Sequence, residues 1–185
     1  MDDGASSYRR FLDGDNEGLR ELLDLYYHGL VLYLNTYLRN LSLAEDLAED
    51  TFFELVAKKP AFGGKSTFKT WLYAIGRNIA AEHLKRESHK KEMLPEELAE
   101  RIADDCNVEE NYIKEQEKVA LHKAMAKLKP LYRQVLWLLY FEDMSYEEVA
   151  QIMNKSLPAV DHLVRRAKLS LKSGMKKEGY DDENH

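Results

Sequence analysis

Apolar residues recur at steps of three and four along most of the chain, the spacing of amphipathic helices. The first such segment runs from Asn16 to Asn40. A second is expected from Ser42, as N-cap with Glu45 as its capping-box partner, to Pro60, which stops it. A third follows a short loop of residues 60–66, is capped by Ser66 or Thr67, and ends near residues 86–88. These three helices, which carry aromatic residues at apolar positions, predict a compact N-terminal domain.

A strongly polar stretch separates this domain from a second helical set. Residues 87–108 have few apolar positions and contain Pro95, which indicates a linker that is partly helical. Further helices are expected over residues 108–127, 130–141, 145–153 and 157–172. The pattern predicts an all-α protein of two small helical domains, an N-terminal bundle over residues 1–90 and a helix-turn-helix domain over 113–177. A linker over 91–112 joins them, and a tail spans 178–185.

The amino-acid composition favours a helical fold and excludes several kinds of site. Four Pro and nine Gly in 185 residues favour helices over turns, and 44% hydrophobic residues can give each domain a core. Cys106 is the single cysteine, which excludes an intramolecular disulfide and a cysteine-built zinc site and fits a reducing cytoplasm. Residues 1–7 do not have the pattern of a signal peptide, and the longest apolar run, 135–141, is too short to span a bilayer. We expect a cytoplasmic protein with no membrane insertion.

The charge distribution is more informative than the net charge of −6. Acidic residues gather in the segments 2–24, 45–54, 92–117 and 142–148, whereas 65–91 and 155–177 are basic. Phosphate binding needs Lys and Arg. Two separate basic segments on an acidic chain therefore indicate DNA binding in two places and a protein partner elsewhere.

Residues 144–160 have the layout of a helix-turn-helix. Ser145 caps a short helix with Glu148 in the capping-box position, and Asn154 can take the left-handed turn conformation. Ser156 caps the second helix, with Pro158 in its first turn. The second helix of such a motif enters the major groove, and its start reads bases while later residues contact phosphates. The expected base readers are Asp161, His162 and Arg165, the expected clamps are Arg166, Lys168 and Lys172, and Ser156 and Ala159 complete the set. The alternative is a packing unit with a merely solvated basic stripe.

Two features of the N-terminal domain also suggest binding. Glu45, Asp46, Glu49 and Asp50 form an acidic helix face that suits a basic protein surface, although it could also be simply solvated. The third helix and the loop before it combine aromatic residues that can stack on bases, namely Phe62, Trp71 and Tyr73, with the cations Lys65, Lys69, Arg77, Lys85 and Arg86. That mixture suits partly unpaired DNA, although Trp71 could equally be a core residue.

Three motifs in this order resemble the extracytoplasmic-function (ECF) group of the sigma subunits of bacterial RNA polymerase. They are Ala44–Phe52, Phe68–Arg86, and Tyr132–Val135 running into Ser145–Ala150, and the resemblance covers about Asn16 to Lys172. It implies a non-enzymatic initiation factor, without cofactor or metal, that binds core polymerase, directs it to specific promoters and assists promoter melting. It also implies an anti-sigma factor as a further partner.

The resemblance assigns roles to particular residues. The helix with the acidic face would dock on the clamp helices of the largest polymerase subunit through Glu45, Asp46, Leu47, Glu49, Asp50 and Phe53. The second domain would meet the polymerase flap and the upstream promoter element. The loop and third helix would capture the non-template strand of the downstream element, where an extruded base enters a pocket near the loop; by position this involves Phe62, Lys65, Ser66, Trp71 and Asn78.

The chain departs from the family pattern at several positions. In the recognition helix Asp161 and Leu163 stand where the family has basic residues, so fewer phosphate contacts are expected. Asp161 could accept a hydrogen bond from a cytosine amino group or repel phosphate. Glu82 replaces the usual Asp, and Lys129 replaces a common Pro.

Two other classes of protein compete with this interpretation. A free-standing helix-turn-helix regulator would act as a dimer and would leave the basic, aromatic Trp71 helix unexplained. A carboxylate hydrolase built on Glu45, Asp46, Glu49 and Asp50 lacks a recognisable nucleophile, metal set or glycine-rich phosphate loop.

Overall fold

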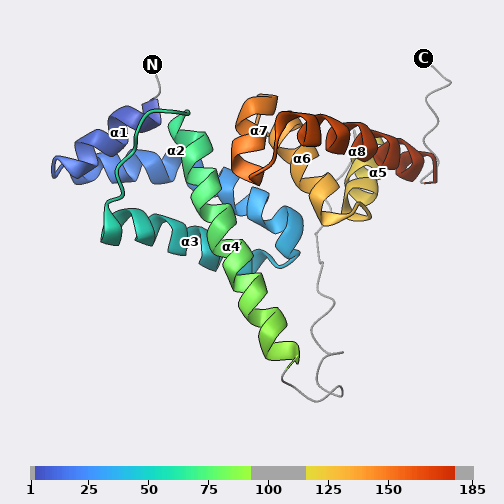
Figure 1. Ribbon diagram of the computed structural model, residues 1–185, viewed down its shortest axis with the longest axis horizontal. Helices are drawn as coiled ribbons and strands as arrows, with labels where there is room; N and C mark the ends of the chain where they lie inside the picture. Colours follow the sequence, from blue (N-terminus) through green and yellow to red (C-terminus); the bar gives the residue numbers. More distant parts are fainter. Residues whose placement is uncertain (1–2, 93–115, 178–185) are drawn as a thin grey trace. The chain divides into compact units, whose positions relative to one another are not determined.

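The computed structural model describes residues 3–92 and 116–177, and every regular element in these two ranges is an α-helix (Figure 1). This confirms the predicted all-α fold. The chain divides into two compact units; α1 to α4 lie in the first, and α5, α6, α8 and the start of α7 lie in the second. No helix within the described ranges is long and apolar enough to cross a membrane.

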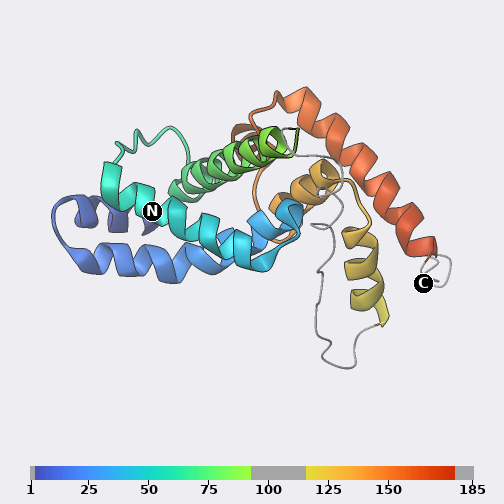
Figure 2. The ribbon, with the colours of Figure 1, turned by 90° about the horizontal axis from the view of Figure 1, so that it is seen from below.

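The first unit is built around α2 (Asn16–Leu38), which packs against α1 (Asp3–Leu12), α3 (Leu41–Lys58) and α4 (Phe68–Glu92) (Figures 1 and 2). Its apolar stripe supplies fully buried leucines, as the periodicity of the sequence predicts. Side chains that are less than 2% exposed form the centre of this core: Leu22, Leu30, Tyr33, Leu34, Leu55, Phe68, Leu72 and Tyr73. The acidic, basic and aromatic residues of interest are therefore held on a rigid three-helix core.

Local capping fixes where these helices begin. The Asn40 side chain accepts a hydrogen bond from the Leu43 backbone N–H at 3.0 Å, so α3 begins at Leu41 and Ser42 lies inside the helix. The predicted Ser42 cap was wrong, because Asn is an equally good cap two positions earlier. Thr67 caps α4, since its Oγ1 accepts the Thr70 N–H at 3.2 Å, and this confirms one of the two predicted caps. The helix continues to Glu92, beyond the predicted end.

Helix α1 was absent from the sequence prediction. Ten residues that include Gly4, Ser6 and Ser7 are too few for an independently stable helix, so tertiary packing must stabilise it. Gly18 of α2 permits that packing, because a Cβ there would overlap the Ser7 carbonyl oxygen of α1. Close contact between two helix backbones thus fixes an element that periodicity alone does not reveal.

The second unit contains α5 (Gln116–Ala126), α6 (Pro130–Tyr140), the start of α7 (Tyr146–Met153) and α8 (Leu157–Lys177). Helix α8 packs against α5 and α6. Its buried positions are Val160, Val164 and Ala167, whereas Arg165, Arg166 and Lys168 are exposed. Residues 108–115 of the predicted 108–127 helix and the predicted linker over 91–112, apart from its first two residues, lie outside the described residues.

The turn between α7 and α8 is as predicted. Ser145 and Glu148 form a reciprocal capping box: the Ser145 N–H donates to Glu148 Oε2 at 2.9 Å, and the Glu148 N–H donates to Ser145 Oγ at 3.2 Å. Asn154 has a φ of 50°, the left-handed conformation expected of it. The Val160 N–H donates to the Ser156 carbonyl at 3.0 Å, which places Ser156 at the start of α8. The helix-turn-helix is thereby confirmed.

Candidate nucleic-acid interface

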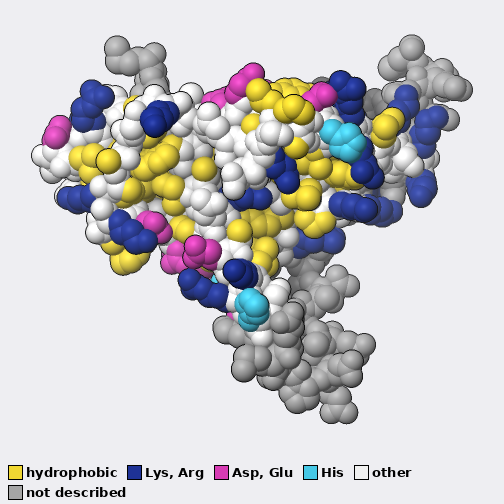
Figure 3. All heavy atoms as spheres, viewed as in Figure 1, with side chains coloured by type: hydrophobic (Ala, Val, Ile, Leu, Met, Phe, Trp, Pro, Cys, Tyr) yellow, Lys and Arg dark blue, Asp and Glu magenta, His cyan; other side chains and the backbone are white. Residues whose placement is uncertain are grey.

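The predicted acidic residues form one exposed face of α3, which we call the acidic face. It consists of Glu45, Asp46, Glu49 and Asp50, all exposed, with Phe53 among them at 69% exposure. Figure 3 shows acidic and apolar side chains next to one another over this helix. Leu47, predicted to share this face, is only 4% exposed and packs in the core, so its side chain supports the acidic face rather than forming it. A large exposed aromatic ring among carboxylates is typical of a protein-binding surface.

A hollow between α3 and the second half of α4 continues the acidic face. It is lined by Leu47, Asp50, Phe53, Glu54, Ala57, Lys58, Ile79, Glu82, His83 and Arg86. Arg86 Nη2 lies 3.4 Å from Glu82 Oε2, an exposed pair on the same helix. The structure thus places Arg86, predicted to bind downstream DNA, at the edge of this hollow.

The electrostatic effect of the acidic face is visible at a neighbouring tyrosine. Burial and the carboxylates of Glu49 and Glu45 together raise the pKa of Tyr27 above its usual range. The same negative potential would attract Lys and Arg side chains of a partner and repel DNA.

A cluster of aromatic side chains joins the loop before α4 to the helix itself. We use the name aromatic cluster for Tyr8, Phe62, Phe68 and Trp71. The Phe62 ring centroid lies 5.2 Å from that of Trp71 and 5.6 Å from that of Phe68, and Tyr8 lies 5.3 Å from Phe68 and 5.5 Å from Trp71. Phe68 and Tyr8 are buried, whereas Phe62 and Trp71 are half-buried. Trp71 is therefore a packing residue whose ring is still partly accessible, and its contact with DNA stays a prediction.

Four predicted polar and basic residues lie in the loop before α4 or on the Trp71 side of that helix. Lys65 is exposed and Ser66 half-buried in the loop. Asn78 and Lys85 follow Trp71 at intervals of seven residues, so they lie on the same side of α4, and both are exposed. Of the predicted downstream residues, Phe62 and Trp71 are in ring contact, Asn78 and Lys85 lie further along the same side of α4, and Lys65 and Ser66 lie in the preceding loop.

Three other predicted downstream residues lie on a different side of α4. Tyr73 is 1% exposed and stacks on Tyr33, with 5.5 Å between ring centroids. The Lys69 ammonium lies 5.6 Å from the centre of the Tyr73 ring, and Arg77 is half-buried, its carbonyl accepting a hydrogen bond from the Tyr37 hydroxyl at 3.5 Å. A buried ring cannot stack on a base, so Tyr73 is corrected to a core residue. Helical spacing shows which residues share a side, but not which side another helix covers.

Tyr33, which stacks on Tyr73, is also buried, and Tyr37 beside Arg77 is half-buried. Burial raises the pKa of Tyr33 and of Tyr37 far above the usual range, so both hydroxyls stay neutral. Within the described parts of the chain, Tyr33 Oη and Arg77 Nε are buried without a hydrogen-bond partner. This side of α4 therefore belongs to the interior of the first unit.

The predicted upstream residues occupy the outer surface of α8. One row, which we call the basic stripe, advances by steps of three and four through Asp161, Arg165, Lys168, Lys172 and Lys176. Beside it a second row holds Ala159, His162 and Arg166, all exposed like Ser156. Figure 3 shows Lys and Arg side chains gathered over this helix.

The contacts of Asp161, Arg165 and Lys168 show how members of the basic stripe are held within the unit. Asp161 Oδ2 and Arg165 Nη2 form an ion pair of 2.9 Å, with 47% and 75% of the respective side chains exposed. The Lys168 ammonium lies 5.3 Å from the centre of the Tyr140 ring, and its hydrogen bond to the Tyr140 hydroxyl raises the pKa of Lys168. The Asp161 carboxylate partly neutralises Arg165, so the positive charge of the stripe is lower near the start of the helix.

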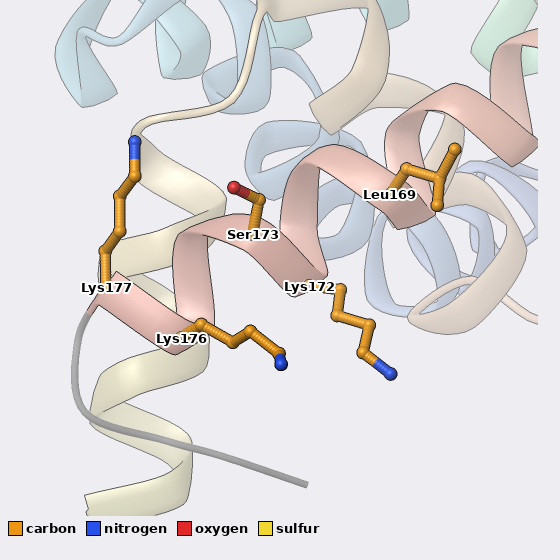
Figure 4. Close-up of a pocket in the computed structure, with 5 residues that line it drawn as sticks. All are labelled: Leu169, Lys172, Ser173, Lys176 and Lys177. Carbon is orange, nitrogen blue, oxygen red and sulfur yellow. The ribbon is translucent and has the colours of Figure 1, made fainter.

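The basic stripe extends further than the sequence analysis predicted. Because α8 runs to Lys177, it adds Lys176 and Lys177 beyond the predicted end near residue 172. Figure 4 shows these residues with Leu169, Lys172 and Ser173, with the Lys172 and Lys176 side chains extending to the same side. The repeat of lysine at positions 168, 172 and 176 was the signal in the sequence that could have revealed this extension.

The two units therefore carry three candidate binding surfaces: the acidic face, the loop with the half-buried rings of the aromatic cluster, and the basic stripe. Comparison with known proteins gives its family. The family model for Sigma-70 region 2 matches residues 22–90, and that for Sigma-70 region 4 matches residues 118–171.

Individual relatives cover nearly the whole chain. RNA polymerase sigma factor YlaC of Bacillus subtilis is 31% identical over 169 residues, which span 87% of this chain and 94% of that protein. The ECF RNA polymerase sigma factor SigM of the same organism is 27% identical over 83% of this chain and 92% of its own length. Among solved structures, the sigma factor RpoE in complex with the anti-sigma factor NepR from Bartonella quintana has the same fold, with a TM-score of 0.62 and 24% identity, covering 85% of this chain and 96% of that one.

The chain belongs to the ECF group of the sigma factors of bacterial RNA polymerase. It directs RNA polymerase to promoters, and its partners are the polymerase and promoter DNA. This confirms the family that the sequence motifs indicated, and the free-standing regulator is not favoured.

Proposed function

We propose that the acidic face of α3 is the main polymerase-binding surface. Four exposed carboxylates around the 69% exposed ring of Phe53 favour a partner with Lys or Arg side chains and an apolar contact at its centre. The clamp helices of the largest polymerase subunit are the expected partner. Since Leu47 is buried, it contributes by holding this surface in place.

The downstream promoter element is assigned to the loop before α4 and the accessible edge of the aromatic cluster. Phe62 and Trp71 can stack on unpaired bases, while Lys65, Ser66, Asn78 and Lys85 can meet the strand backbone. Capturing unpaired bases favours the open form of the duplex, since unstacking costs only about a few kcal/mol per step. Binding energy in place of covalent chemistry would thus assist melting, which makes the protein a regulatory subunit and not an enzyme.

The upstream element is assigned to α8. A helix-turn-helix presents the start of its second helix to base edges, so Ser156, Ala159, Asp161 and His162 are the candidate readers. Arg165, Arg166, Lys168 and Lys172 would contact phosphates, and the extension of α8 adds Lys176. The polymerase flap is the expected protein partner of this second domain.

The proposed domain scheme keeps residues 1–90 for polymerase and downstream DNA and residues 113–177 for upstream DNA, joined by a linker over 91–112 and followed by a tail. An anti-sigma factor that covers the DNA-binding surfaces is a further proposed partner. The similar structures of RpoE with NepR and of CnrH with the cytosolic domain of CnrY support the existence of such complexes among proteins of this fold. Because polymerase acts in the cytoplasm of bacteria, the cytoplasm is the proposed location of the protein.

The observation that carries the polymerase assignment is the exposed acidic face around Phe53, and charge reversal tests it. The variant Glu45→Lys with Asp46→Lys should lose association with purified core polymerase in a pull-down. Circular dichroism should show an unchanged helical fold, because both side chains are exposed. The matched control is Glu17→Lys with Asp24→Lys on the exposed surface of α2, which should retain association. Retained association of the α3 variant would remove this helix from the interface.

A further inference from the structure

Helix α1 contacts the loop that carries Phe62, and α1 itself lies outside the residues that the region 2 family model matches, 22–90. The Tyr8 hydroxyl of α1 donates a hydrogen bond to the Pro60 carbonyl at 2.8 Å. Tyr8 is 1% exposed, and burial raises its pKa, so the hydroxyl remains a donor at neutral pH. The Tyr8 ring also contacts Phe68 and Trp71.

A second contact from α1 reaches the same loop. The Lys59 ammonium lies 5.4 Å from the centre of the Phe11 ring, and Lys59 is the left-handed C-cap of α3, with a φ of 42°. Tyr8 and Phe11 therefore contact the first two residues after α3, where the chain leaves the helix and enters the loop.

The loop needs such external support because its own sequence is permissive. A methyl group on Gly63 or Gly64 would meet no atom within 4 Å, and Gly64 has a φ of 65°. Because no neighbouring atoms confine these two glycines, the contacts at Pro60 and Phe62 are what hold the first half of the loop.

Helix α1 is itself firmly attached to α2. Arg10 binds Asp15 at 2.6 Å and Glu21 at 2.8 Å, and the Ser7 hydroxyl donates to the other oxygen of Glu21 at 2.6 Å. These hydrogen bonds lower the pKa of Asp15 and of Glu21. The helix thus connects the loop to the α2 core through three separate contacts: the Arg10 pairs, the close packing at Gly18 and the Tyr8 side chain.

From these contacts we propose that α1 is a positioning element for downstream promoter recognition, with Tyr8 as the positioning residue. The inference rests on the proposed role of the Phe62 loop in reading the downstream element. Tyr8 touches no DNA in this account; it fixes the backbone from which Phe62 meets the Trp71 ring and Lys65 reaches the strand.

The test removes only the Tyr8 hydroxyl, in Tyr8→Phe, and measures two quantities in the full chain. Hydrogen–deuterium exchange of residues 59–67 reports on loop position without DNA or polymerase. The second quantity is transcription by polymerase from a set of promoters in which each base of the downstream element is changed in turn. It measures discrimination between correct and altered downstream sequences. We expect faster loop exchange and a loss of discrimination of about two- to tenfold, the range of one ordinary hydrogen bond.

A matched control separates positioning from general stability. Thr51→Val removes another buried hydroxyl of the same unit, one that donates to the Leu47 carbonyl at 2.7 Å and has no contact with the loop hydrogen bond. It should lower thermal stability by a similar amount and leave both the loop exchange and the discrimination unchanged. Equal loss of discrimination in Thr51→Val and Tyr8→Phe would overturn the positioning role.

A third variant, Phe62→Ala, distinguishes failure of this inference from failure of the proposed function. If Phe62→Ala lowers discrimination and Tyr8→Phe does not, the role of α1 is wrong and the loop remains the reading element. If loop exchange is unchanged in Tyr8→Phe, the positioning role is also wrong. If Phe62→Ala leaves discrimination intact, the proposed downstream role of the loop fails, and the inference that rests on it fails too.

Discussion

The aromatic cluster of the first unit and the basic stripe of the second, the two surfaces proposed to bind DNA, are built in different ways. In the cluster, Phe62 and Trp71 are half-buried and pack on the fully buried Phe68, so the same rings that stabilise the fold are the ones proposed to contact DNA. On α8 the candidate contacts are exposed side chains above a separate core of Val160, Val164 and Ala167. Binding and stability should therefore be coupled in the first region and independent in the second.

The largest expected effect is at Trp71. Trp71→Ala removes a ring that contacts Tyr8, Phe62 and Phe68, so we expect a loss of about 3 kcal/mol in the free energy of unfolding together with a loss of promoter-specific transcription. Urea denaturation and run-off transcription measure the two quantities. Loss of transcription with unchanged stability would break the coupling and make Trp71 a contact residue only.

A smaller effect, confined to binding, is expected on α8. Arg166→Ala with Lys172→Ala alters two exposed side chains, so the free energy of unfolding should change by no more than about 0.5 kcal/mol. If both contact phosphates, the slope of log affinity against log salt for upstream duplex should fall by about 1.8. Fluorescence anisotropy over a salt series measures this slope, and the exposed pair Lys123→Ala with Lys127→Ala on and just after α5 is the control. An unchanged slope would exclude these residues from the interface.

The smallest effect is expected at Asp161, whose carboxylate binds Arg165 at 2.9 Å. Asp161→Asn removes the negative charge, releases Arg165 for a phosphate and should raise affinity for unrelated duplex DNA by about two- to fivefold, since a charge pair ~4 Å apart is worth about 1 kcal/mol in water. The preference for a particular base pair at one position of the upstream element should weaken at the same time. Unchanged binding across a library of upstream sequences would show that Asp161 does not face DNA.

The contrast between the two regions also explains what could be predicted from sequence. The helix-turn-helix was predicted in detail because Ser145, Glu148 and Asn154 act locally, through contacts with neighbours in the chain. Helix α1 and the burial of Tyr73 were not predicted, because each depends on residues distant in sequence: Gly18 opposite Ser7, and Tyr33 opposite Tyr73. The acidic face was predicted as a set, but Leu47 points to the core, which periodicity could have indicated.

The most direct test of the account is transcription by purified core polymerase with this protein from a library of random promoter sequences. We predict transcripts from defined start sites that share two separated elements, with Phe62→Ala weakening selection only at the downstream element and Arg166→Ala weakening binding only at the upstream element. Start sites that share a single element, or variants in either unit that alter both elements equally, would contradict the assignment of one DNA surface to each unit.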